Sequence, residues 1–159
     1  MYSDILFVFD IDDTLVVPRD IEIREKETFM VFNPVCVKKQ MFRFYEGRIK
    51  NKDNVLLLTA RHPNCKQDIA NYFTIPKNKI ICRDFSLDIN DCKKLIKSKN
   101  RNNIFYYRMY LSKIDTLNKL SNDYDLVIFF DDFADKMNTF ASNLKILNNN
   151  IIITLPISD

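Results

Sequence analysis

ILFVFDIDDTL, residues 5–15, is the stretch of sequence that decides the fold. Its first five residues are apolar and rich in β-branched and aromatic types, which is typical of a strand buried on both faces of a parallel sheet. Asp10, Asp12 and Asp13 follow at the strand end, where open α/β sheets bind their ligands. Asp10 and Asp12 leave room there for Mg²⁺ between carboxylate and backbone oxygens, with an aspartate-rich surface turn as the alternative.

Further apolar runs alternate with helical patterns along the chain. Strands are predicted at residues 55–58, 79–82, 126–130 and 151–154. Helices are predicted from 34 to about 50, from 63 to about 73, around 88–97, over 111–120 and from 133 to 144, while 104–107 fits either type. This order predicts an α/β fold, a three-layer Rossmann-like domain with a mostly parallel five-stranded sheet.

Two connections are too short for a separate lid domain. Residues 16–32 mix charge with short apolar pairs and predict a small β flap after the first strand, ending in a strand at 28–32. Between the third strand and Lys113 there is room for about one extra helix. We therefore expect no large cap domain and a single domain over residues 1–159, a length that buries about two-thirds of the unfolded surface.

Composition excludes several protein classes. Gly47 is the only glycine, and the phosphate-binding loops of P-loop and dinucleotide-binding proteins need more than one, so both classes are excluded. Asparagine is then expected to supply positive φ angles in turns such as 51–54 and 148–150. No apolar run approaches the roughly 20 residues of a membrane span and no signal peptide is visible, so no membrane association is expected. The scattered cysteines, without a C-x-x-C pair, predict reduced thiols in a cytoplasmic protein and argue against zinc.

Three of the predicted strands end in residues that suit phosphate chemistry. The first delivers Asp10 and Asp12, the second Thr59, and a later one Asp131 and Asp132. Because the carboxyl ends of parallel strands meet at one edge of the sheet, these side chains are expected to form one site. Lys113, near the start of a predicted helix, is the expected cation of the site, with a solvent-exposed helix lysine as the alternative.

The order and spacing of these residues resemble the haloacid dehalogenase-like (HAD) superfamily over nearly the whole chain. Four segments carry the resemblance: DIDDT (10–14) to motif I, LLLTAR (56–61) to motif II, Lys113 to motif III, and IFFDD (128–132) to the double-aspartate form of motif IV. Two residues depart from the pattern. Asp13 stands where the family often has glycine, although aspartate tolerates unusual backbone angles. Phe133 stands where the polynucleotide-phosphatase branch, which the double aspartate resembles, often has arginine.

The resemblance implies roles for the four main aspartates. Asp10 would be the nucleophile, and Asp12 the general acid and base. Asp10, Asp12, Asp131 and Asp132 would together hold Mg²⁺. A cation is needed because an ionised carboxylate attacks phosphorus only where the charge repulsion between the two is masked.

The resemblance also implies roles for four other side chains. Thr59 and Lys113 would hold the phosphoryl oxygens during catalysis. Thr14 and Arg61 would contact the substrate, with the capping of a surface turn as the alternative for Arg61.

The implied activity is that of an Mg²⁺-dependent phosphomonoester hydrolase with an aspartyl-phosphate on Asp10. Nucleic-acid 3′-phosphate ends are one candidate substrate, because basic and aromatic residues alternate from Lys93 to Lys113 without an acidic residue, a pattern that suits single-stranded nucleic acid. Packing of these aromatics in the core is the alternative. Two other functions stay open: a catalytically silent HAD-like module that binds nucleic acid or protein, and a small-molecule phosphatase such as a nucleotidase. The sequence carries no signal for the oligomeric state.

Overall fold

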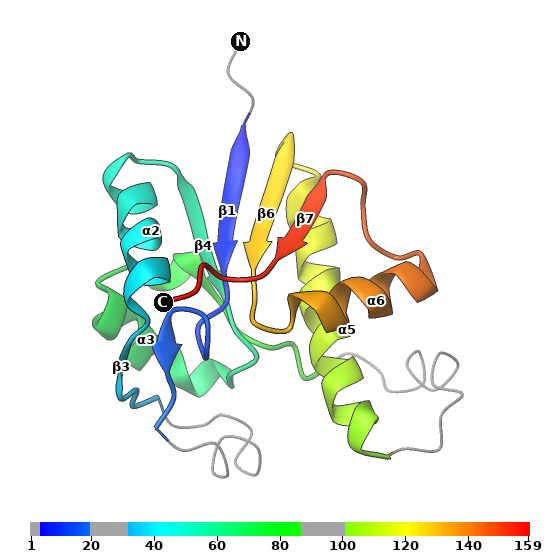
Figure 1. Ribbon diagram of the computed structural model, residues 1–159, viewed down its shortest axis with the longest axis horizontal. Coiled ribbons are helices and arrows are strands. Elements are labelled where there is room, and N and C mark those ends of the chain that lie inside the picture. Colours follow the sequence, from blue (N-terminus) through cyan, green and yellow to red (C-terminus); the bar gives the residue numbers. More distant parts are fainter. Residues whose placement is uncertain (1–3, 20–31, 87–100) are drawn as a thin grey trace.

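Five parallel strands form the central sheet of the computed structural model, which describes residues 4–19, 32–86 and 101–159 (Figure 1). The strands are β1 (Ile5–Phe9), β4 (Asn54–Leu58), β5 (Ile80–Ile81), β6 (Leu126–Phe130) and β7 (Ile151–Thr154). They lie in the order β5-β4-β1-β6-β7, and every neighbouring pair is parallel. The predicted five-stranded sheet is confirmed, and β1 is its central strand.

Helices cover both faces of this sheet. Four α-helices are described: α2 (Lys39–Lys50), α3 (Lys66–Phe73), α5 (Arg101–Ser121) and α6 (Ala134–Leu144). The α2 and α3 helices lie on one side of the sheet, and α5 and α6 on the other (Figure 1). Because side chains alternate along a strand, β1 supplies both layers: Leu6 and Val8 join the core under α5 and α6, and Phe9 joins the core under α2 and α3. This is the predicted three-layer, Rossmann-like arrangement.

A two-stranded antiparallel pair follows β1, in the place of the predicted flap. Its strands are β2 (Val16–Val17) and β3 (Cys36–Val37). Of the segment predicted as a strand at 28–32, only Phe32 is within the described ranges, and it is not in a strand. The described part of the chain contains no large cap domain, as predicted.

The start of the first long helix was predicted wrongly. Asn33 and Pro34 form a local helix-start signal, yet α2 begins only at Lys39. The intervening residues pair with β2 instead, and the Lys38 amide donates to the Leu15 carbonyl at 2.8 Å. Pairing with a distant strand therefore overrides the local signal.

Three other predictions can be compared with the structure. Residues 104–107 belong to α5, so the ambiguous segment is helical, and Lys113 lies in the middle of a 21-residue helix instead of near its start. The helix predicted around 88–97 lies outside the described residues. The expectation that asparagine supplies the positive φ angles is wrong for both turns, since Lys52 adopts φ 59° in the first and the described residues of the second have none.

Two findings bear on the expected setting of the protein. Within the described ranges, no helix has both the length and the apolar character needed to cross a membrane. Among the described cysteines, Cys36, Cys65 and Cys82 form no disulfide.

Candidate active site

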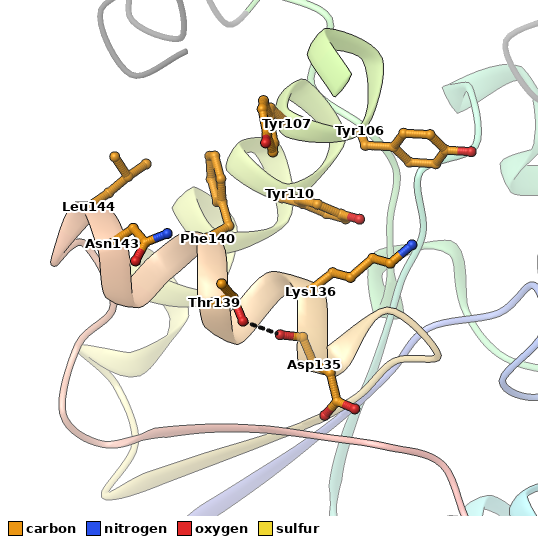
Figure 2. Close-up of a pocket in the computed structure, with 9 residues that line it drawn as sticks. All are labelled: Tyr106, Tyr107, Tyr110, Asp135, Lys136, Thr139, Phe140, Asn143 and Leu144. Atoms are coloured by element: carbon orange, nitrogen blue, oxygen red, sulfur yellow. Dashed lines mark hydrogen bonds between the residues drawn. The ribbon is translucent and has the colours of Figure 1, made fainter. Parts of the chain in front are cut away.

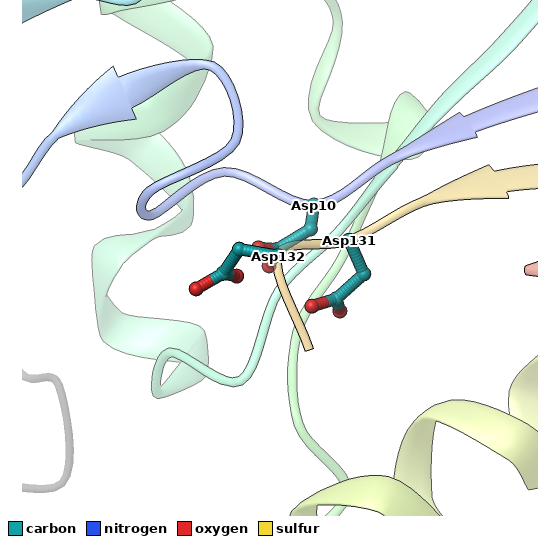
Figure 3. Close-up of side chains that lie close together, drawn as sticks. All are labelled: Asp10, Asp131 and Asp132. Atoms are coloured by element: carbon teal, nitrogen blue, oxygen red, sulfur yellow. The ribbon is translucent and has the colours of Figure 1, made fainter. Parts of the chain in front are cut away.

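The carboxyl ends of β1 and β6 bring three carboxylates together. Phe9 pairs in register with Phe130, so Asp10 and Asp131 emerge side by side, and the Asp10 amide donates to the Phe130 carbonyl at 2.9 Å. One carboxylate oxygen from each of Asp10, Asp131 and Asp132 lies within 4.8 Å of the others (Figure 3). Three of the four strand-end aspartates that the sequence predicted to meet, Asp10, Asp131 and Asp132, therefore lie in one cluster.

Lys113 reaches this cluster from the middle of α5. Its Nζ donates to Asp10 Oδ1 at 3.0 Å and to Asp131 Oδ2 at 2.7 Å, and its side chain is only 4% exposed. Burial opposes the charge on Lys113, but the two carboxylates outweigh burial and raise its pKa above the ordinary value. Lys113 is thus a buried, charged member of the site and not a solvent-exposed helix lysine.

One lysine does not neutralise three carboxylates. Burial, and after it the charge of Asp131, raises the pKa of Asp10 well above its ordinary value, while Lys113 acts in the opposite direction. Burial and the same neighbour raise the pKa of Asp132 to about 7. A divalent cation among these oxygens would relieve the repulsion, and carboxylate oxygens are the ligands that Mg²⁺ prefers. The donor set therefore fits Mg²⁺, with Asp10, Asp131 and Asp132 as the residues that could hold it.

Thr14 links two of the aspartates. Its hydroxyl donates to Asp10 Oδ2 at 2.9 Å and accepts the Asp132 amide at 3.2 Å, and the residue has no exposed surface. The sequence suggested that Thr14 contacts the substrate, and this burial gives that role no support. Thr14 instead fixes the orientation of the Asp10 carboxylate.

The loop after β1 turns sharply at Asp13. This residue adopts φ 61°, in the left-handed region, and its amide donates to the Val16 carbonyl at 2.8 Å. Aspartate is among the non-glycine residues that tolerate this conformation best. Asp13 thus makes a turn with a backbone conformation that glycine adopts most readily.

Asp12 is held apart from the cluster by Arg61. The Nε and Nη2 atoms of Arg61 donate to the two Asp12 carboxylate oxygens, each at 2.8 Å, and the side chains are 4% and 12% exposed respectively. The carboxylate group formed by the other three aspartates does not include Asp12. Its carboxylate is thus placed as the partner of Arg61 and not as a fourth metal ligand, and Arg61 lies inside the site and not on a surface turn.

Thr59 supports the Arg61 segment. Its amide donates to the Ile81 carbonyl at 2.9 Å, and its hydroxyl accepts the Arg61 amide at 3.1 Å. Among the residues that the structure describes, no hydrogen bond joins the Thr59 hydroxyl to the aspartate cluster. Thr59 is therefore placed at the correct strand end, but its contact is with the backbone that carries Arg61.

Sequence reasoning did not assign Tyr110 to the site. Tyr110 is buried one helical turn before Lys113, and its ring centroid lies 6.0 Å from that of Phe133. Burial, and next Asp131, raises the pKa of Tyr110 to about 12. Its spacing of three residues from Lys113 on a helix was the signal that could have identified it. The alternative that the aromatic residues before Lys113 pack in the core is confirmed for Tyr110, and Tyr106 and Tyr107 are partly buried against the same core.

The sequence was also compared with known proteins. No family model matches it, and no curated protein matches it either.

Proposed function

We propose that this protein is a HAD-like, Mg²⁺-dependent phosphomonoester hydrolase that works through an aspartyl-phosphate on Asp10. The observation that carries the proposal is the Lys113 ammonium held between Asp10 and Asp131, beside Asp132, at the end of a parallel sheet. An anionic nucleophile approaches a phosphate only where positive charge offsets the repulsion. A buried lysine in contact with the attacking carboxylate meets that need in part, and Mg²⁺ held by Asp10, Asp131 and Asp132 would withdraw further charge from the phosphate.

In the first step, an oxygen of Asp10 attacks phosphorus, and the bond from phosphorus to the ester oxygen breaks. Thr14 and Lys113 hold the two Asp10 oxygens in a fixed orientation for this attack. Asp12, which leaves the same strand end, is the proposed donor of a proton to the leaving oxygen.

In the second step, water attacks the phosphorus of the aspartyl-phosphate. Asp12, now a carboxylate, accepts the proton of that water. The bond from phosphorus to Asp10 breaks, so that inorganic phosphate leaves and Asp10 is restored. The same residue thus acts as acid and then as base, and the proton balance closes over the cycle.

The ion pair between Asp12 and Arg61 is the observation that favours a second candidate. Both Asp12 oxygens accept hydrogen bonds from Arg61, so proton transfer requires this pair to open. An incoming phosphate would compete for the guanidinium, because arginine binds phosphate and carboxylate with the same planar geometry. If the pair never opens, the chain would instead be a catalytically silent module that binds nucleic acid or a protein partner.

The substrate class remains part of the proposal. Nucleic-acid 3′-phosphate ends and small nucleotides both present the phosphate monoester that the site would take. A reducing, cytoplasmic setting is proposed as well, in which thiols such as those of the described cysteines stay reduced.

The test is hydrolysis of 4-nitrophenyl phosphate by the purified protein with Mg²⁺ and with EDTA. A panel of 3′- and 5′-phosphorylated oligonucleotides, nucleotides and sugar phosphates then identifies the substrate class. Activity should require Mg²⁺, should disappear in Asp10→Asn, and should persist in Asp4→Asn, which changes an exposed aspartate before β1. Absence of hydrolysis on every phosphoester would refute the proposal. Tight oligonucleotide binding without Mg²⁺ affinity in titration calorimetry would favour the silent module.

A further inference from the structure

A groove lies between α5, which carries Lys113, and α6, which begins two residues after Asp132. Its volume is about 490 Å³, within the range of small-molecule sites. Tyr106 and Tyr110 line it from α5, and Lys136 and Thr139 from α6 (Figure 2). The proposed hydrolase mechanism uses none of these four side chains.

The inner end of the groove lies against the site. Tyr110 precedes Lys113 by one helical turn. The rings of Tyr106 and Tyr110 lie 5.7 and 6.0 Å from the ring of Phe133, the residue that directly follows Asp132. A group bound in the groove would therefore be a close neighbour of a phosphate at Asp10.

The lining combines flat rings with polar groups. Tyr107 and Phe140 stack on each other at 5.1 Å with an interplanar angle of 17°, and the rings of Tyr106 and Tyr110 are 6.4 Å apart. Figure 2 shows the hydroxyls of Tyr106 and Tyr110 and the ammonium of Lys136 pointing the same way. Such a surface suits a planar ring that carries hydrogen-bonding atoms at its edge better than it suits an alkyl chain.

We propose that this groove binds the nucleobase of the nucleotide that carries the scissile phosphate. The inference rests on the proposed phosphatase activity and names its substrate class, a base-bearing phosphate monoester. The base stacks against Tyr106, which is partly exposed, and Lys136 contacts its polar edge. Tyr110 is buried and supports the groove wall.

Paired substrates test the groove directly. Thymidine 3′-phosphate and 1,2-dideoxyribose 3-phosphate present the same ester, and only the first has a base. The wild-type protein should show a kcat/KM about 5- to 100-fold higher for thymidine 3′-phosphate, the factor that base–aromatic stacking supplies. Tyr106→Leu should remove most of this ratio, and Tyr106→Phe should keep it. Tyr124→Leu, which removes a partly buried tyrosine packed against the same core but absent from the groove lining, should leave the ratio unchanged.

Binding separates this inference from the proposed function. In an Asp10→Asn background, titration calorimetry should show tighter binding of thymidine 3′-phosphate than of the abasic ester, and Tyr106→Leu should abolish the difference. The affinity of a (dT)10 oligonucleotide with a 3′-phosphate is then compared with that of thymidine 3′-phosphate. Tighter binding of the oligonucleotide would indicate a strand end as the substrate, and tighter binding of thymidine 3′-phosphate would indicate a free nucleotide. A base preference without turnover would uphold the groove and refute the phosphatase. Equal kcat/KM for the two esters with equal binding, or a ratio that Tyr106→Leu does not change in a folded variant, would overturn the inference.

Discussion

Asp10 and Asp12 leave the same strand end, yet they lie in opposite electrostatic surroundings. Asp10 shares one lysine with Asp131 and lies near Asp132, so its neighbourhood carries excess negative charge. Asp12 has an arginine whose guanidinium meets both of its oxygens, so that pair is neutral. Two carboxylates from one short motif thus differ in the balance of charge around them.

The difference separates what each carboxylate can do. Asp10 lies in a group of three carboxylates with one lysine, so under the proposed function it would bind a metal ion and then meet a phosphate. Asp12 already has its cation, so it becomes available for proton transfer only when Arg61 moves to another anion. Substitutions in the Asp10–Lys113 pair and in the Asp12–Arg61 pair should therefore have different measurable effects.

The largest expected effect separates the two aspartates by activity. Asp10→Asn should abolish turnover, because an amide is a far poorer nucleophile and a poorer metal ligand. Asp12→Asn should lower turnover of an alkyl phosphate by about 10²–10⁴-fold, the usual contribution of general acid–base catalysis. With an activated aryl phosphate, whose leaving group needs little protonation, Asp12→Asn should still be phosphorylated and should accumulate labelled phosphoenzyme. Wild-type rates in Asp10→Asn, or label trapped on another residue, would show that the roles are wrong.

The next largest effect is on protein stability, which should fall more when Lys113 is replaced than when Arg61 is replaced. Lys113→Met should lower the free energy of unfolding by about 3–5 kcal/mol at pH 8 in EDTA, because buried carboxylates lose their only described cation. Arg61→Met should cost about 1–3 kcal/mol, since the Asp12 carboxylate is more exposed and water can replace part of the lost hydrogen bonding.

Urea unfolding measures both losses. Lys119→Met is the matched control, because Lys119 is an exposed lysine of the same helix in an i,i+4 pair with Asp115, and its loss should stay within about 0.5 kcal/mol. Equal losses for Lys113→Met and Arg61→Met would remove the contrast between the two pairs.

The strands and their terminal aspartates were predictable because the decisive signal is local. Each of β1 and β6 is an unbroken apolar run followed at once by aspartate, and parallel packing then brings the strand ends together. The start of α2 was not predictable in this way, since the Asn33–Pro34 signal competes with strand pairing to Val16 and Val17. The positive φ angle of Lys52 likewise follows from the short turn between α2 and β4 and not from the intrinsic preference of lysine.

The partner of each charged side chain was the least predictable part of the site. Arg61 and Asp12 are 49 residues apart, and whether Asp12 faces a metal site or a guanidinium depends on the tertiary placement of β4 beside β1. Lys113 was predicted to be the cation of the site, but its two partners follow from the packing of α5 against β6. Sequence spacing therefore indicated which residues meet, and only the fold determined which of them pair.

The smallest expected effect concerns the excess charge itself. The pKa of Asp132 is raised to about 7 from an ordinary value of 3.8, so the folded state keeps a proton that the unfolded state has lost between these two pH values. Without metal, the free energy of unfolding should therefore fall as pH rises from about 4 to about 7, and then level off for this group. Asp132→Asn should flatten part of this fall and be more stable than wild type by about 1–3 kcal/mol at pH 8 in EDTA. Added Mg²⁺ should make wild type more stable than Asp132→Asn, because it binds the folded wild-type protein and stabilises it by mass action.

Thermal or urea unfolding of both proteins at pH 5 and pH 8, with Mg²⁺ and with EDTA, measures these differences in stability. Asp135→Asn, which changes an exposed aspartate in the first turn of α6, is the control. If Asp132→Asn were less stable than wild type in EDTA at pH 8, the cluster would not carry the uncompensated charge that distinguishes it from the Asp12–Arg61 pair.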